Sequence, residues 1–237
     1  MERLQKVIAQ SGYCSRRKAE ELIKNKKVVV NGKLVTEMGF KVSYDDDILV
    51  DGNQLATKEE KVYYLLNKPR GVITTVSDEK NRKTVVDLID EKARIYPVGR
   101  LDYDTTGALI LTNDGELTAL LTHPKNEIEK VYVAKVNGFF SSDNCKTLSR
   151  GVIIDGKRTS KARVKLKKYD KKTDTSLVEL VIHEGKNHQV KKMIEAVSHK
   201  VIKLRREKIA FLTLTGLKSG EYRKLTIHEV KKLYASK

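Results

Sequence analysis

The sequence is poor in cysteine and contains no long hydrophobic run. Its two cysteines, Cys14 and Cys145, form no C-x-x-C pair, which argues against a disulfide framework or a thiolate metal site. No apolar run approaches the roughly 20 residues that span a bilayer, and residues 1–6 lead into an amphipathic stretch rather than a signal peptide. Internal repeats and low-complexity segments are also absent. We therefore expect a cytoplasmic protein that does not bind membranes.

The sequence also lacks the spacing of a zinc site on a helix. His183-Glu184 begins such a motif, but the second histidine would have to be residue 187 and is instead His188. Gly185 would moreover interrupt the helix that holds both histidines. We expect no metal site in this chain.

Positive charge, in contrast, is abundant. The chain has 48 Lys and Arg against 31 Asp and Glu, which gives a formal net charge of +17. Such an excess favours a polyanion as partner, and nucleic acid is preferred over a membrane because no hydrophobic anchor is present. The charge is uneven, since residues 1–60 carry 11 basic and 10 acidic side chains, or +1 of the +17. We therefore expect residues 61–237, with the remaining +16, to make most of the phosphate contacts.

The N-terminal part of the chain has the pattern of two helices followed by a hairpin. Apolar residues at helical spacing predict helices over residues 4–8 and 16–23. Two β-rich runs then flank Asn31-Gly32, which is a strong signal for a tight hairpin. The polar residues 53–61 are typical of a linker.

The first turn of the second predicted helix is unusually basic. Ser15 is a favourable N-cap, and the three residues that follow it are Arg16, Arg17 and Lys18. Cations at a helix start oppose the helix dipole, so this turn is destabilised unless an anion binds there. Exposed amides and basic side chains together can form a phosphate site. An ordinary solvated charge run would have the same sequence, and both interpretations stay open at this point.

The most informative stretch lies between Gly99 and Gly107. It contains Arg100 and two acids, the first of which is Asp102, and the flanking glycines permit a tight, shaped loop. Residues 108–112 then form an apolar run of buried-strand length, which would hold the loop on a rigid base. Either the loop presents an acid in a fixed direction, or the acid only caps a turn.

The rest of the chain is rich in strand signals and ends in a basic region. Strands are predicted over residues 62–66, 72–76, 108–112, 129–136 and 176–182. A turn with two cations, Lys68 and Arg70, reads equally well as a surface turn or an RNA contact. Residues 186–208 hold 8 Lys or Arg against 2 Glu. Many strands among few, short helices predict an α+β fold with a largely antiparallel sheet.

The loop motif resembles the signature of a known enzyme family. Gly-Arg-Leu-Asp at residues 99–102, followed by Asp-Thr-Thr-Gly at residues 104–107, resembles the motif of RNA pseudouridine synthases. The resemblance runs from Arg3 to about Glu229 and is strongest to the branch that modifies ribosomal RNA and carries an S4-like domain. It implies a small S4-like RNA-binding domain over 1–60. A mixed-sheet catalytic domain with a central cleft would follow over 61–237.

The resemblance implies isomerisation of uridine to pseudouridine in ribosomal RNA. Residues 123–136 most resemble members that act on the large subunit, while members acting on the small subunit share the loop motif and remain an alternative. A non-catalytic S4-type binder of ribosomal RNA is a further alternative. Asp102 argues against it, because a binder gains nothing from an acid that faces phosphates. Asp102 and Asp104 could also suggest a glycosidase, but that reading leaves the basic region unexplained.

The resemblance also implies roles for individual residues. Asp102 matches the nucleophile, and Lys191 matches the basic residue that pairs with it. Tyr132 matches the tyrosine that stacks on the target uracil and is a candidate for removing the C5 proton. Arg100 matches the arginine that enters the helix vacated by the flipped base. Leu204 matches an apolar residue that lines the base pocket.

RNA contacts are expected from basic and polar residues in both parts of the chain. They are Arg16, Arg17, Lys18, Arg100, Lys186, His188, Gln189, Lys192 and Arg205. Many relatives carry Arg where this chain has Lys186, Lys191 and Lys192, and Lys keeps the charge while losing the bidentate geometry of Arg. The expected partner is ribosomal RNA or a ribosome assembly intermediate, bound by a monomer. No cofactor is expected, because the reaction oxidises nothing and transfers nothing from outside.

Overall fold

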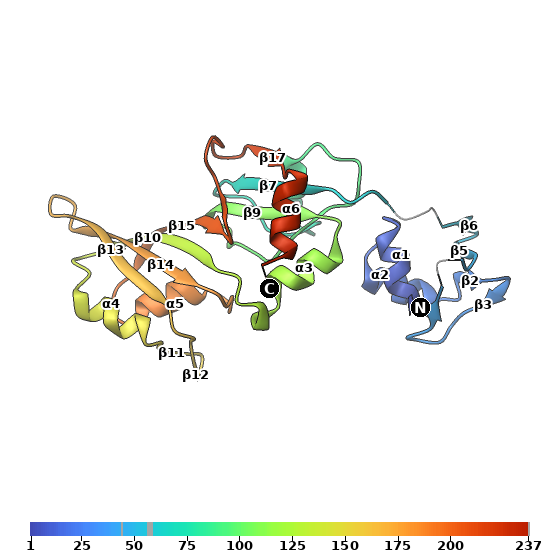
Figure 1. The fold of residues 1–237 in the computed structure, drawn as a ribbon, viewed down its shortest axis with the longest axis horizontal. Helices are drawn as coiled ribbons and strands as arrows, with labels where there is room; N and C mark the ends of the chain where they lie inside the picture. The colour runs from blue at the N-terminus through green and yellow to red at the C-terminus, as the bar shows by residue number, and fades with distance from the viewer. Residues whose placement is uncertain (44, 56–58, 237) are drawn as a thin grey trace. The chain divides into compact units, whose positions relative to one another are not determined.

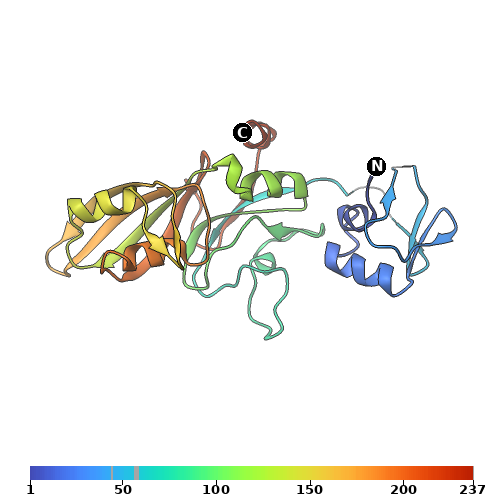
Figure 2. The ribbon, with the colours of Figure 1, turned by 90° about the horizontal axis from the view of Figure 1, so that it is seen from below.

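The computed structural model describes residues 1–43, 45–55 and 59–236, and Figures 1 and 2 show it from two sides. Part of the predicted linker, residues 56–58, lies outside the described residues. The chain divides into two compact units. The smaller unit comprises Met1–Val62, Glu91–Ile95 and Asn113–Gly115, and the larger unit comprises Tyr63–Asp90, Tyr96–Thr112 and Glu116–Lys237.

The smaller unit packs two helices beside short antiparallel strands (Figure 2). Its elements are β1 (Glu2–Arg3), α1 (Leu4–Gln10), α2 (Arg16–Lys24), β2 (Val28–Val30), β3 (Lys33–Leu34), β4 (Lys41–Val42), β5 (Ile48–Val50) and β6 (Asn53–Gln54). The strands form a sheet in the order β3-β2-β5-β6 and a separate β1-β4 pair. A single core joins the elements, since Leu4, Ile8, Ala19, Ile23 and Val28 are all buried together.

Two local predictions are confirmed in the smaller unit. The Ser15 hydroxyl accepts a hydrogen bond from the Lys18 amide at 3.1 Å, so Ser15 is the N-cap of α2. In the hairpin, Val30 pairs with Lys33. The two loop residues, Asn31 and Gly32, have φ angles of 50° and 74°. Positive φ at both positions is what a two-residue hairpin of matched twist requires.

The larger unit is built around one nine-stranded sheet (Figure 1). Its strands are β7 (Tyr63–Lys68), β8 (Tyr96–Pro97), β9 (Thr106–Thr112), β10 (Lys130–Asn137), β13 (Arg163–Asp170), β14 (Thr175–Ile182), β15 (Val201–Ile209), β16 (Leu212–Thr213) and β17 (Tyr222–Lys224). The order is β13-β14-β10-β15-β9-β7-β17, with β16 beside β15 and β8 beside β9. Among the described strands, only β9 and β15 pair in parallel. The predicted α+β fold with a largely antiparallel sheet is therefore confirmed.

Short helices and a small hairpin complete the larger unit. They are η1 (Val86–Leu88), α3 (Gly115–Thr122), η2 (Pro124–Asn126), α4 (Ser142–Ser149), the hairpin β11 (Ile153–Ile154) and β12 (Lys157–Arg158), α5 (Gln189–Glu195) and α6 (Ile227–Tyr234). Helices α3 and α6 share a core with β7 and β9 that includes Leu65, Ile110, Leu117 and Leu233. This core gives the loop that precedes β9 a rigid base. Within the described residues, no helix combines the length and apolarity needed to cross a membrane.

The parallel contact between β9 and β15 depends on one glycine. Gly107 pairs with Arg206 and has a φ of +110°, which side chains rarely permit. A Cβ atom on Gly107 would lie 2.1 Å from the Arg206 carbonyl oxygen. The glycine therefore allows the two strands to approach directly behind the loop.

The prediction of a strand over residues 72–76 is wrong. The segment has only an isolated bridge, between Ile73 and Thr84. Thr74 instead bonds to the loop, because its hydroxyl donates to the Leu101 carbonyl at 2.6 Å, and the preceding Gly71 amide donates to the Tyr103 carbonyl at 2.9 Å. The segment braces the loop rather than extending the sheet.

Candidate active site

Asp102 lies in the loop between β8 and β9 and is held by residues of α5 and its N-cap. Its carboxylate Oδ2 lies 3.0 Å from Lys191 Nζ, and Oδ1 lies 3.4 Å from His188 Nε2. The turn itself is closed by backbone, since the Asp102 carbonyl accepts from the Thr105 amide at 3.1 Å. Within the described residues, no amide uses the Asp102 carboxylate as a cap. The acid is therefore aimed outward from a shaped loop.

Lys191 bridges two carboxylates. Its Nζ donates to Asp104 Oδ1 at 2.7 Å, which is closer than its contact with Asp102. This hydrogen bond lowers the pKa of Asp104 below its usual range, against an opposing effect of burial. Partial burial acts to lower the pKa of Lys191, but the hydrogen bonds to Asp104 and Asp102 outweigh it and raise the pKa. The ammonium group is therefore charged and fixed between both acids.

Lys68 supports the loop that carries Asp102, and this role was not predicted from the sequence. It is fully buried at the end of β7, so it is neither a surface turn residue nor an RNA contact. Its Nζ donates to the backbone carbonyls of Asp102 at 3.1 Å, Thr105 at 3.0 Å and Pro69 at 3.1 Å. Burial lowers the pKa of Lys68 to about 8, even though Asp102 and Asp104 act to raise it. The loop that carries Asp102 is thus tied to the sheet by a buried cation.

A cavity of about 430 Å³ opens beside Asp102. Its wall on β10 and β15 includes Tyr132 and Leu204, which are 8% and 7% exposed. Antiparallel register places Tyr132 opposite Arg206. Arg206 Nη1 donates to the Tyr132 hydroxyl at 3.3 Å, and Arg206 Nε donates to the Ala108 carbonyl at 2.7 Å. The cavity therefore brings the expected nucleophile, stacking tyrosine and apolar base contact into one space.

Some of the predicted RNA-binding residues line the cavity, and others lie elsewhere. Arg100, Lys186 and His188 line the cavity. Lys192 makes an exposed ion pair with Asp155 and is not among the lining residues. Arg205 alternates with the inward-facing Leu204 and Arg206, so it lies on the opposite face of β15. The exposed Arg16, Arg17 and Lys18 belong to α2 of the smaller unit.

Gln189, another of the predicted RNA contacts, is hydrogen-bonded within the protein. It is only 4% exposed, although it borders the cavity. Its side-chain amide donates to Glu184 Oε1, and its oxygen accepts from the Lys186 amide at 2.9 Å. With both ends of its side-chain amide hydrogen-bonded, Gln189 fixes the turn that leads into α5.

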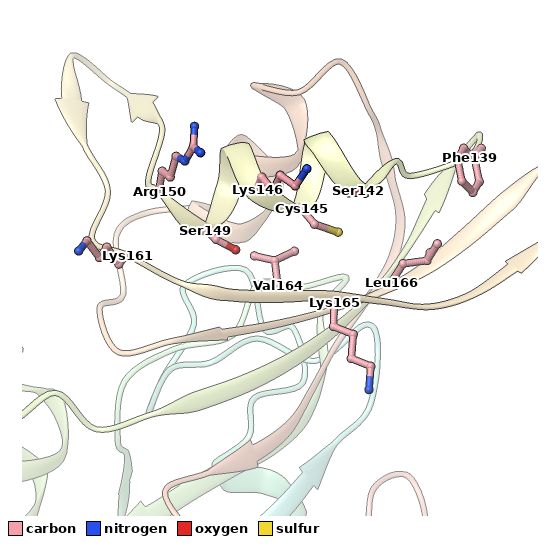
Figure 3. A pocket seen from close by; sticks show the side chains of 10 residues that line it. All are labelled: Phe139, Ser142, Cys145, Lys146, Ser149, Arg150, Lys161, Val164, Lys165 and Leu166. Atoms are coloured by element: carbon pink, nitrogen blue, oxygen red, sulfur yellow. The ribbon is translucent and has the colours of Figure 1, made fainter.

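A second hollow, about 620 Å³ in volume, lies between α4 and β13 (Figure 3). Its lining includes Cys145 and Val164 but none of the residues around Asp102. The described residues also contain no group of three or more His, Cys, Asp or Glu side chains placed to hold a metal ion. The cavity beside Asp102 is therefore separate from this second hollow.

Comparison with known proteins identifies the family. Residues 62–196, which include Asp102, Tyr132 and Lys191, match the family described as RNA pseudouridylate synthase, and residues 2–48 match the S4 domain. The chain belongs to the RNA pseudouridylate synthase family. It is 56% identical over 236 residues to the ribosomal large subunit pseudouridine synthase B of Bacillus subtilis (strain 168), covering 99% of this chain and 96% of the relative.

Further relatives extend the comparison along the whole chain. An uncharacterized RNA pseudouridine synthase of Aquifex aeolicus (strain VF5) is 38% identical over 235 residues, covering 98% of this chain and 93% of that protein. A crystal structure of a pseudouridylate synthase, 32% identical, superimposes with a TM-score of 0.71 and covers 98% of this chain and all of that chain. The protein is accordingly a pseudouridine synthase with an N-terminal S4 domain.

Two basic residues that line this pseudouridine synthase cavity were not predicted from the sequence. Arg206 is 3% exposed and contacts Tyr132, while Lys130 lines the cavity two positions before Tyr132 on β10. Strand alternation was the available signal, because Lys130 shares a strand face with Tyr132, and Arg206 shares one with Leu204. A cation on the buried face of a strand is unusual enough to mark a functional position.

Proposed function

We propose that this protein converts a specific uridine of large-subunit ribosomal RNA to pseudouridine, with Asp102 as the nucleophile. The observation that carries the proposal is the position of the Asp102 carboxylate, 3.0 Å from Lys191 Nζ and beside a cavity of base-accommodating size. The 56% identity to a relative named for the large subunit supports the choice of RNA. Small-subunit RNA is the alternative outcome of the test below.

The reaction breaks the bond from uracil N1 to ribose C1′ and forms a bond from C5 to the same carbon. Asp102 would take up C1′ while the base turns, and would leave when C5 attacks. The proton lost from C5 needs an acceptor, and Tyr132, at the cavity wall, is the candidate. N1 gains a proton, so the product is an isomer and no external reagent is consumed. Lys191 would keep Asp102 ionised and oriented.

RNA would be held by both parts of the chain. We assign the positioning of the substrate to an S4-like domain over residues 1–60 and the catalytic contacts to residues 61–237. Arg100 and His188, both at the cavity, would contact the RNA around the flipped nucleotide. The enzyme would act as a monomer in the cytoplasm, on ribosomal RNA or on an assembling particle.

The central test replaces Asp102 by Asn. The substitution keeps the volume of the side chain but removes its nucleophilicity, so pseudouridine formation should fall below detection while the fold and RNA affinity remain. Asp104→Asn is the matched control, because it removes a carboxylate from the same lysine while leaving the nucleophile in place. Melting temperature, RNA binding and pseudouridine yield are measured for both variants. Wild-type yield from Asp102→Asn would refute the mechanism.

Mapping pseudouridines in cells identifies the substrate. Ribosomal RNA from cells with and without the gene for this protein is compared position by position. Loss of one pseudouridine in large-subunit RNA is the expected result. A loss confined to small-subunit RNA would overturn the choice of substrate while leaving the isomerisation itself in place.

A further inference from the structure

Two cations that line the candidate active site have no carboxylate partner among the residues that the structure describes. Arg206 donates to two neutral groups, the Ala108 carbonyl and the Tyr132 hydroxyl, and its Nη2 is buried with no partner among the described residues. Lys130 Nζ donates to the carbonyls of Ile128 at 3.0 Å and His183 at 3.1 Å. Lys191, in contrast, is balanced by both nearby acids. The wall beside Tyr132 thus carries positive charge in excess.

The two cations are close enough to affect each other. Burial, and to a smaller extent the charge of Arg206, lower the pKa of Lys130 to about 8. An ammonium group has three donors, and the described residues supply acceptors for two of those on Lys130. Buried like charges of this kind are unfavourable in the free protein, and they are found where a site must bind or form an anion.

The proposed reaction creates such an anion. When N1 separates from C1′, the electron pair of that bond stays on the base, and the charge spreads over N1 and the carbonyl oxygens of uracil. Charge that develops inside a cleft is stabilised most by cations fixed in advance, because no reorganisation is needed at the moment of reaction. Both cations lie with Leu204 in the lining of the cavity where the base is expected.

We infer that Lys130 and Arg206 form an electrostatic site that stabilises the uracil anion released from ribose. The inference rests on the proposed function, since it concerns the leaving group of that reaction. The apolar neighbours Leu204, Ile182 and Ile209, each less than 10% exposed, favour a base over a phosphate as the occupant. A phosphate contact would be expected at an open, wet surface.

The experiment compares the leaving group in two RNAs. Full-length Lys130→Gln and Arg206→Gln are assayed in single turnover on a ribosomal RNA transcript that contains uridine or 5-fluorouridine. Fluorine withdraws electrons and stabilises the base anion without help from the protein. C5 of the fluorinated base has no proton to lose, so the final deprotonation cannot occur. The disappearance of the 5-fluorouridine peak in digested RNA therefore measures the rate of the steps up to reattachment of the base to the ribose.

Each variant should react on uridine at least about tenfold more slowly than wild type with little change in RNA affinity. On 5-fluorouridine the rate of the same variants should fall much less, because the fluorine already stabilises the negative charge on the base. Lys130→Arg and Arg206→Lys, which keep the positive charge, should each restore part of the rate on uridine. Lys135→Gln is the matched control, since Lys135 lies on the opposite face of β10, and it should react like wild type on both RNAs.

Three results would overturn the inference. They are an equal loss on both RNAs, a loss confined to RNA affinity and its salt dependence, or wild-type rates for both variants. The first outcome would mark Lys130 and Arg206 as structural supports of Tyr132, and the second as phosphate contacts. Asp102→Asn is run on both RNAs in parallel, because activity in that variant would refute the proposed function independently of the two cations.

Discussion

Gly107→Ala is expected to be the most damaging single-methyl change in the loop region. The added Cβ would lie 2.1 Å from the Arg206 carbonyl oxygen, on a backbone with φ +110°. Gly99, at the other end of the same loop, provides the comparison. Its φ is +72°, and the nearest atom to an added Cβ is Thr122 Cγ2 at 4.0 Å. The sequence gives no reason to distinguish the two glycines, but the structure shows that only Gly107 lacks space for a side chain.

The expected costs differ because only one site lacks space. Gly99→Ala should cost about 1–2 kcal/mol, the usual penalty for a side chain in the left-handed region. Gly107→Ala adds a clash with backbone, and β15 must retreat by more than about 1 Å to relieve it. That movement breaks the β9–β15 pairing and the bond from Arg206 Nε to the Ala108 carbonyl. The total should reach about 4 kcal/mol or more.

Thermal and denaturant unfolding of both variants provide the assay. For a chain of this size, 4 kcal/mol corresponds to a melting temperature lowered by about 8–16 °C, against a few degrees for Gly99→Ala. Single-turnover activity at a temperature where both variants are folded should also fall further for Gly107→Ala, because β15 carries Arg206 and Leu204. A Gly107→Ala protein that melts at or above Gly99→Ala would show that β15 yields easily and would refute the reasoning.

Three further predictions follow from charged groups. Lys191→Met should lose most of the single-turnover rate, whereas Lys191→Arg should keep a good part of it, because the cation balances two carboxylates. A near-normal rate for Lys191→Met would show that Lys191 does not belong to the active site. Replacing residues 16–18 by Gln should flatten the salt dependence of RNA binding by up to about three phosphate contacts, and an unchanged slope would place RNA elsewhere. The hydrogen bond with Arg223 lowers the pKa of Glu229 from 4.5 to about 2, so its stabilisation is present above pH 4.5 and lost as the pH falls toward 2. The difference in unfolding free energy between wild type and Glu229→Gln should shrink over that window, and a constant difference would contradict the assignment.

Features set by a few neighbouring residues could be predicted from the sequence. The Ser15 cap and the Asn31-Gly32 hairpin are examples, because their partners are adjacent in the chain. The loop around Asp102 was found through its motif. Its surroundings could not be inferred so directly, because Lys191 contacts Asp104 across 87 residues.

The features that were predicted wrongly or missed have a common physical cause, because they depend on contacts between residues far apart in the chain. Residues 72–76 have the composition of a strand, but Thr74 bonds to the loop at Leu101 and Ile73 makes only an isolated bridge with Thr84. Lys68 looks like a turn cation, and its burial depends on three carbonyls, two of which belong to the loop. Arg205 and Arg206 are adjacent arginines that the sequence alone does not distinguish. Only the register of β15 with β10 shows which of them faces the cavity.

The parallel pairing of β9 with β15 also sets an order of assembly. The Arg206 side chain reaches the Ala108 carbonyl across 98 residues of chain, and long-range parallel contacts form late in folding. A growing polypeptide therefore carries Asp102, the proposed nucleophile, for a long interval before Lys191, Arg206 and β15, which complete the candidate active site, are synthesised. Until the strand that ends at Ile209 is made and docked, RNA that meets the nascent enzyme finds positive charge but no isomerase.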